Sequence, residues 1–189
     1  MSLTILDPKT ALILIDLQKG VAAYAPSPTL SEAARQAGAL AAAFRRHHLP
    51  VVLVNVAGSA PGRTEQKRPQ PQPSADFLDF LPELDQRPSD HVVTKQTWGA
   101  FVNTSLESYL KDAGITQVVL GGVATSIGVE STARQAYELG FHVTLATDAM
   151  ADLFADAHAN SLTRIFPRLG ETGTVQEITG LLAKSRAGA

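Results

Sequence analysis

With 189 residues, of which 44% are hydrophobic and 18% charged, the chain is long enough to bury a core, and we expect a single domain over residues 1–189. Its formal charge of −2 comes from scattered acids and bases, without the basic block that binds nucleic acid or an anionic membrane. No apolar run reaches the roughly 20 residues of a membrane-spanning helix. We therefore expect a cytoplasmic protein that binds neither nucleic acid nor a membrane. The chain has no cysteine, which excludes disulfides, thiolate metal ligands and thiol catalysis.

Strands and helices alternate along the chain. Short, continuous apolar runs are typical of strands covered on both faces, as in parallel sheets. Longer segments with apolar residues at helical spacing, several of them ended by glycine, predict helices. In chain order, the patterns predict a strand at 11–15, a helix at 30–48, strands at 51–54 and 92–93, a helix at 105–113, a strand at 118–120, a helix at 129–139, a strand at 143–145, and helices at 155–169 and 175–185.

This alternation predicts an α/β fold, a three-layer α/β/α sandwich around a mostly parallel six-stranded sheet of Rossmann-like type. Residues 58–73 contain four prolines and no periodicity. They predict a surface loop, either a lid or subunit contact or a plain connection.

Three strand ends carry residues suited to chemistry. Asp16 directly follows the first strand, Lys95 follows the third, and a glycine-rich turn, Gly121 to Gly128, follows the fourth. Ligands of open α/β sheets bind beyond the carboxyl ends of the strands, near the point where the strand order reverses. We therefore expect these three segments to meet at one site.

The same segments resemble the isochorismatase-like hydrolases. The run V-A-T-S-I-G-V-E-S-T at 123–132 is similar to the nucleophile turn of that family, V-A-T-S-I-C-V-E-S-T, with Gly128 in place of the cysteine. The run A-L-I-L-I-D-L-Q at 11–18 resembles the opening strand, T-K-Q-T-W-G-A-F at 94–101 the lysine segment, and T-D-A-M-A-D at 147–152 a block after the fifth strand. The resemblance extends from about Thr10 to Val175.

The resemblance implies a role for each matching residue. In complete relatives the aspartate takes the thiol proton, the lysine holds the charges, the thiolate attacks an amide carbonyl, and backbone N–H groups of the turn stabilise the oxyanion. The catalytic set here is then Asp16, Lys95 and Gly128. Substrate or oxyanion contacts fall to Gln18, Trp98, Phe101, Ala124 and Thr125.

Two further expectations concern the turn itself. Family precedent places a cis peptide bond between Val123 and Ala124. The helix that follows begins near Ser126, and Thr125 and Ser126 are expected to cap its N-terminus with their side chains.

Gly128 leaves two kinds of function open. True isochorismatases also carry glycine at this position and cleave the vinyl ether of isochorismate to a diol and pyruvate, with the aspartate protonating the methylene carbon. That reaction needs a protonated Asp16, which burial favours and Lys95 opposes. The sequence around Gly128 is nevertheless the amidase-like version, and the arginines available to hold two carboxylates have no diagnostic place: Arg63, Arg68 and Arg87.

The competing hypothesis is a catalytically silent protein, natural or engineered from cysteine to glycine, that binds a small amide or acid. Ser126 and Ser131 lack an evident base and are not expected to replace the thiol. The function expected first is a family hydrolase acting on a small metabolite.

No cofactor and no metal are expected. Nicotinamidases of this superfamily bind a metal through an Asp-x-His pair and a further histidine, and residues 55–60 offer no such ligands. Because relatives form dimers or tetramers, we expect a homodimer or homotetramer, in which Trp98 and Phe101 either cover a neighbour's pocket or line their own.

Overall fold

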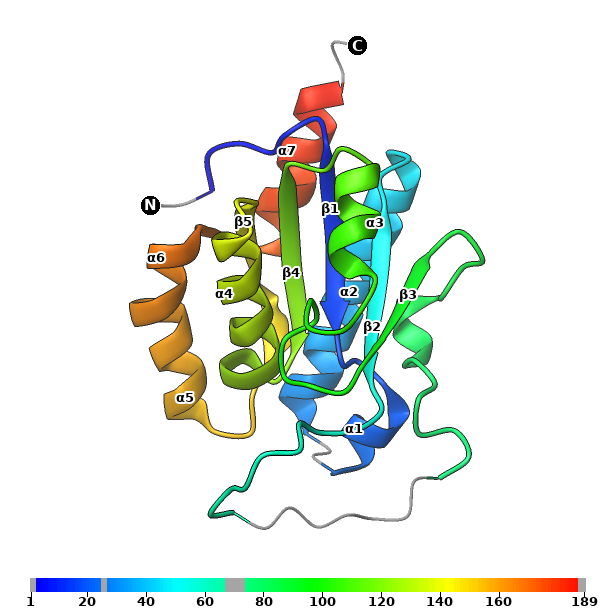
Figure 1. The fold of residues 1–189 in the computed structure, drawn as a ribbon. Coiled ribbons are helices and arrows are strands. Elements are labelled where there is room, and N and C mark those ends of the chain that lie inside the picture. The colour runs from blue at the N-terminus through cyan, green and yellow to red at the C-terminus, as the bar shows by residue number, and fades with distance from the viewer. Residues whose placement is uncertain (1–2, 25–26, 67–73, 187–189) are drawn as a thin grey trace.

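The computed structural model describes residues 3–24, 27–66 and 74–186, which form a six-stranded sheet with strand order β3-β2-β1-β4-β5-β6 (Figure 1). Every strand pair is parallel. The strands are β1 (Thr10–Ile15), β2 (Val51–Val56), β3 (His91–Lys95), β4 (Gln117–Val123), β5 (His142–Ala151) and β6 (Glu171–Gly173). From β1 the chain first adds strands on one side and then returns to add β4 on the other, so the strand order reverses between β1 and β4.

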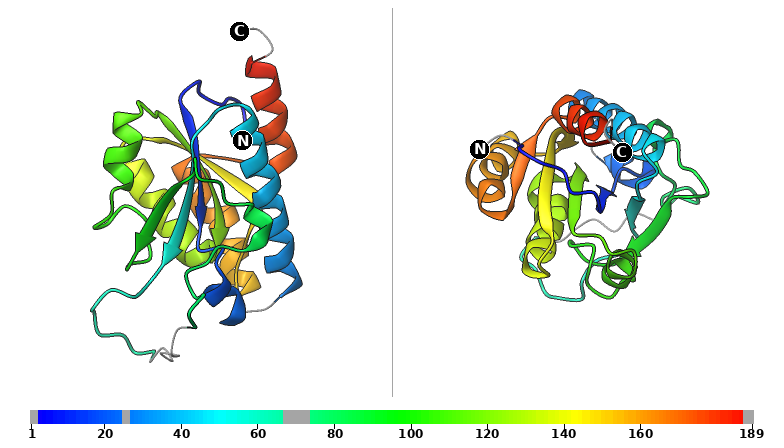
Figure 2. Two further views of the ribbon diagram at one scale, coloured as in Figure 1. Left: turned by 90° about the vertical axis from the view of Figure 1, so that its right-hand side faces the viewer. Right: turned by 90° about the horizontal axis from the view of Figure 1, so that it is seen from above.

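Helices cover both faces of the sheet and complete the expected three-layer sandwich (Figure 2). The helices are α1 (Lys19–Tyr24), α2 (Pro28–Arg46), α3 (Leu106–Asp112), α4 (Glu130–Glu138), α5 (Ala155–Asn160), α6 (Phe166–Leu169) and α7 (Val175–Arg186), with a 3₁₀ turn at Pro82–Leu84 and π-helical turns at Thr125–Val129 and Ser161–Ile165. The helices α2 and α7 pack on one face, and α3, α4 and α6 pack on the other.

The strand β1 shows why continuous apolar runs predicted a covered sheet. All six of its residues are buried. Leu12 and Leu14 belong to the core under α2 and α7, whereas Ala11, Ile13 and Ile15 belong to the core under α3 and α4. Successive side chains of a strand point to opposite faces, so each face must be apolar when both are covered.

The fifth strand is longer than predicted. The block at 147–152 was expected to follow this strand, but β5 continues to Ala151. A register shift beside Leu120 and Gly122 lets β5 keep its pairing with β4. One polar residue of the block is held by the segment after β6, since the Asp148 carboxylate accepts the N–H of Val175 at 2.7 Å.

Other elements also differ from the prediction. The expected helix at 155–169 is divided into α5, a π-helical turn and α6, because Pro167 has no N–H to continue the helical ladder. The short elements α1 and β6 were not predicted. The part of the 58–73 loop that the structure describes, 58–66, is exposed, and the rest of the loop, with Arg68, lies outside the described residues.

Candidate functional site

Asp16 and Lys95 meet at the carboxyl edge of the sheet although β2 separates their strands. The Lys95 ammonium donates to Oδ2 of Asp16 at 2.8 Å and to the carbonyl oxygens of Thr97 and Trp98 at 3.1 and 3.0 Å. An ammonium has three N–H donors, and these three acceptors use them all. The Lys95 side chain, only 2% exposed, is therefore a fixed positive charge beside Asp16.

The carboxyl group of Asp16 is buried, and only one of its oxygens is paired. Asp16 is 7% exposed and has a positive φ of 54°, a left-handed conformation that aspartate tolerates better than most residues. Its Oδ1 has no hydrogen-bond partner among the residues that the structure describes. Burial raises the pKa of Asp16 to about 6, and the charge and hydrogen bond of Lys95 only partly oppose this effect. Asp16 can thus carry a proton close to neutral pH.

Gly128 lies directly against Asp16. A Cβ atom on Gly128 would lie 3.2 Å from Oδ2 of Asp16, 3.1 Å from the carbonyl oxygen of Val123 and 3.0 Å from Cγ2 of Ile15. The glycine is buried in the π-helical turn Thr125–Val129, a geometry that is frequent at functional sites. The structure therefore brings the three predicted catalytic positions together, and space at the third is tight.

The turn that carries Gly128 begins with the cis peptide bond between Val123 and Ala124 that the resemblance implied. The expectation that Thr125 and Ser126 cap the helix with their side chains is wrong. The Thr125 hydroxyl instead pairs with Nδ1 of His158 at 2.8 Å. The N–H of Ser126 is capped from outside the turn, by Oδ2 of Asp152 at 2.7 Å.

Other N–H groups of the turn also have partners within the chain. Ile127 and Val129 both donate to the carbonyl oxygen of Ala124, at 3.1 and 3.2 Å. Three N–H groups of the turn, those of Ser126, Ile127 and Val129, are therefore already used within the chain.

A buried threonine connects the turn to the lysine segment. The hydroxyl of Thr132 donates to the carbonyl oxygen of Gly128 at 2.7 Å and accepts the N–H of Ala100 at 3.1 Å. The two segments are thereby held in a fixed relation.

The side chains of three other predicted contact residues have their own partners or surroundings. Both ends of the Gln18 side chain bind backbone, with Nε2 donating to Phe77 and Val56 carbonyls and Oε1 accepting the N–H of Val56. Phe101 lies in the core, where its ring stacks against Phe141 at a centroid distance of 6.1 Å. The Trp98 side chain is half exposed, and this residue reaches the centre through its carbonyl oxygen.

Two of the arginines considered for binding carboxylates, Arg63 and Arg87, lie in the described part of the chain. Arg63 is exposed in the loop after β2. Arg87 is exposed before the start of β3 and pairs with Asp85, so it lies toward the opposite edge of the sheet from the carboxyl ends.

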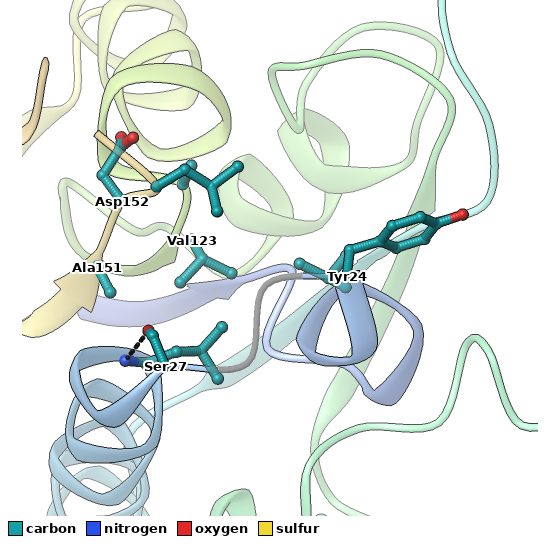
Figure 3. A pocket seen from close by; sticks show the side chains of 9 residues that line it. Tyr24, Ser27, Val123, Ala151 and Asp152 are labelled. Carbon is teal, nitrogen blue, oxygen red and sulfur yellow. Dashed lines mark hydrogen bonds between the residues drawn. The ribbon is translucent and has the colours of Figure 1, made fainter. Parts of the chain in front are cut away.

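An apolar hollow of about 140 Å³ adjoins the turn (Figure 3). Its lining comes from α1, the start of α2 and the ends of β4 and β5: Val21, Tyr24, Ser27, Leu30, Val123, Ala124, Ala151, Asp152 and Leu153. The hollow adjoins the predicted catalytic positions at the Val123–Ala124 peptide rather than at Asp16 itself. Asp152 is the one acidic residue among the described residues that line the hollow, and in the sequence it stands out only as the last residue of the motif at 147–152.

Within residues 3–24, 27–66 and 74–186, no group of three or more His, Asp or Glu side chains is placed to hold a metal ion. No helix among those same residues is long and apolar enough to cross a membrane.

Comparison with known proteins decides the family. A family model described as the isochorismatase domain matches residues 10–177. The chain belongs to the isochorismatase family. Two uncharacterized isochorismatase family proteins match this chain over almost their full length. YecD of Escherichia coli O157:H7 is 43% identical over 182 residues, which cover 92% of this chain and 96% of YecD. YwoC of Bacillus subtilis is 40% identical over 176 residues, which cover 89% of this chain and 92% of YwoC.

A solved structure agrees with the family assignment. An isochorismatase family protein from Burkholderia thailandensis superposes with a TM-score of 0.89 at 38% identity, covering 96% of this chain and all of that one. The isochorismatase-family fold therefore extends over nearly the whole chain.

Proposed function

We propose that this isochorismatase-family protein hydrolyses a small metabolite with Asp16 as its acid and base, Lys95 as the electrostatic partner of Asp16, and neither a covalent intermediate nor a metal. The observation that carries the proposal is the buried, half-paired carboxyl group of Asp16, whose pKa is raised to about 6. Gly128 has no side chain to attack a substrate. A proton on Asp16 is the reactive group that remains.

The reaction that suits such a proton is hydrolysis of an enol (vinyl) ether, the bond present in isochorismate. Asp16 gives its proton to the terminal carbon of the C=C bond, and an oxocarbenium cation forms. Water adds to the cation, the resulting hemiketal collapses to a carbonyl compound and an alcohol, and the proton released returns to the carboxylate. Lys95 holds the carboxylate in place while it is charged.

Product release from two substrates tests this proposal. Isochorismate would give pyruvate, and the neutral phenyl vinyl ether would give acetaldehyde and phenol. We expect release from at least one of them, faster as the pH falls through about 6, and a loss of about 100-fold or more in Asp16→Asn. Asp156→Asn, which removes an exposed carboxylate on α5, is the matched control and should behave like the parent. Failure to release a carbonyl product above background from both, or full activity in Asp16→Asn, refutes the proposal.

A second candidate is a binding protein without turnover that retains an amidase-like site. What favours it is the amidase-type sequence of the turn and the Asp16–Lys95 contact beside a missing thiol. Gly128→Cys tests it, since ammonia released from small amides would reveal an otherwise complete centre. The double variant Asp16→Asn/Gly128→Cys is the control and should release none.

We also propose that the protein assembles as a dimer or tetramer in which Trp98 covers a neighbour's pocket. Its half-exposed indole supports this role, whereas Phe101 is buried in its own core. Light scattering should give the mass of two or four chains, and Trp98→Ala should reduce it. A monomer at micromolar concentration contradicts the proposal.

A further inference from the structure

We infer that Gln135, on α4, is a positioning residue of the Asp16 centre, because its amide holds residues 97–101 where two carbonyl oxygens of that segment fix the Lys95 ammonium against Asp16. The role is indirect, since Gln135 acts through this segment and through Lys95. Gln135 lies beyond the nucleophile-turn motif, which ends at Thr132. The inference rests on the proposed function only in treating Asp16 as the reacting acid.

Side chains on one face of α4 bind two consecutive N–H groups of the segment 97–101. The Thr132 hydroxyl accepts the N–H of Ala100 at 3.1 Å. Oε1 of Gln135 accepts the N–H of Phe101, also at 3.1 Å. Residues three apart in a helix lie on the same face. The helix α4 therefore presents a pair of acceptors that fixes the segment against it.

Gly99 allows the segment to approach α4 closely. A Cβ atom on Gly99 would overlap Cδ, Oε1 and Nε2 of the Gln135 side chain. Glycine is suited to such a position because it has no side chain to collide with the neighbouring group. The Gln135 amide is therefore the surface on which Gly99 rests, and the place of that amide decides how near the segment can come.

Gly99 is joined in turn to the residues that hold Lys95. The Thr97 hydroxyl donates to the carbonyl oxygen of Gly99 at 2.9 Å. The carbonyl oxygens of Thr97 and Trp98, directly before Gly99, accept from the Lys95 ammonium at 3.1 and 3.0 Å. The third bond of the ammonium, at 2.8 Å, goes to Oδ2 of Asp16. A shift of Gly99 therefore disturbs two of the three hydrogen bonds that fix this charge.

The hold of Lys95 on Asp16 depends on these two carbonyl oxygens. The Lys95 side chain is only 2% exposed, so little water is at hand to replace a lost acceptor, and the ammonium would turn away toward solvent. Burial raises the pKa of Asp16, and Lys95 is the one charged group among the described residues that lowers it. Displacing the segment should therefore raise this pKa further.

A carboxyl-detected NMR titration of Asp16 tests the inference. Gln135→Met keeps the length of the side chain and removes its oxygen, so the Asp16 midpoint should rise by at least about half a pH unit, less than in Lys95→Met. Gln176→Met makes the same change at an exposed position of α7, which packs on the opposite face of the sheet, and should leave the midpoint unchanged. A residue that only stabilises the fold would lower the free energy of unfolding without moving this midpoint.

A second variant disturbs the same contact from the other side. Gly99→Ala displaces the Gln135 amide without removing it and should also raise the Asp16 midpoint. This variant keeps the inference testable if Gln135→Met does not fold.

An unchanged or lowered Asp16 midpoint in either folded variant overturns the inference, and so does an equal rise in Gln176→Met. The titration involves no turnover. A raised midpoint without product release from isochorismate or phenyl vinyl ether refutes the proposed function and leaves this inference standing. Product release with an unchanged midpoint does the reverse.

Discussion

The close packing around Gly128 can be tested by adding one methyl group and measuring the change in stability. In Gly128→Ala the new Cβ would lie 3.0 Å from Cγ2 of Ile15, 3.1 Å from the Val123 carbonyl oxygen and 3.2 Å from Oδ2 of Asp16. Each contact requires its neighbour to move by a few tenths of an ångström. Two of the three atoms belong to a backbone carbonyl and a buried, ion-paired carboxylate, which yield less readily than a free side chain.

Two effects of opposite sign decide the result. Overpacking a tight site costs about 1–3 kcal/mol, whereas replacing glycine by alanine within a helix gains about 0.5–1 kcal/mol. The net expectation is a loss of about 1–2 kcal/mol in the free energy of unfolding. For a chain of this length, that corresponds to a decrease of roughly 2–8 °C in Tm.

A second helical glycine provides the matched control. A Cβ on Gly180, in α7, would meet no atom of the described residues within 4 Å. Gly180→Ala should therefore gain about 0.5–1 kcal/mol. Urea unfolding followed by circular dichroism would measure both variants against the parent. If Gly128→Ala is as stable as the parent or more stable, the tight contact between Gly128 and Asp16 is refuted.

Four more predictions concern buried polar groups. Because the pKa of Asp16 rises from 3.8 to about 6 on folding, the folded state binds more protons than the unfolded state between these pH values. The free energy of unfolding should therefore fall by about 3 kcal/mol as the pH rises from 3.8 to about 6. Urea midpoints measured across this range should show the fall, and in Asp16→Asn they should change less with pH. Lys95→Met removes both influences that lower this pKa, so a carboxyl-detected NMR titration should find the Asp16 midpoint higher still, by roughly one to three pH units; an unchanged midpoint would contradict the pairing. Thr132→Val leaves two buried backbone groups without their hydroxyl partner and should lower the free energy of unfolding by about 1–3 kcal/mol, measured in urea. A variant as stable as the parent would contradict a role for these two hydrogen bonds. Asp90→Ala breaks a pair whose side chains are 1% exposed at Asp90 and 16% at Arg45 and should cost about 3 kcal/mol by the same assay, with little dependence on salt.

The sequence predicted the strands whose signal is apolar burial on both faces. β1, β2 and β4 are of this kind, and each was expected close to its observed bounds. β6 carries only the residues Glu, Thr and Gly. It forms because β5 offers an edge for pairing, and no local sequence pattern predicts this pairing.

The site was predicted in part. Asp16, Lys95 and Gly128 were expected to meet, and they do. Whether Asp16 can hold a proton depends on the balance between burial and one ion pair, which spacing along the chain does not contain.

Two side chains near the site illustrate the same limit. Gln18 follows the first strand as a ligand residue would, yet its amide is used by backbone groups 38 and 59 residues away. Asp152 is quoted in a motif, but its position as the wall of a hollow and the cap of the turn follows from the unexpected length of β5. Contacts between distant segments decide such roles.

The three-fold bonding of Lys95 limits how this protein can change over evolutionary time. A planar guanidinium cannot aim its donors at three acceptors arranged around a single ammonium nitrogen. An arginine at this position would leave carbonyl oxygens unpaired and enlarge a group that has no room to grow. Arginine at this position should therefore be poorly tolerated, whereas the residues that line the hollow can change without disturbing these three hydrogen bonds.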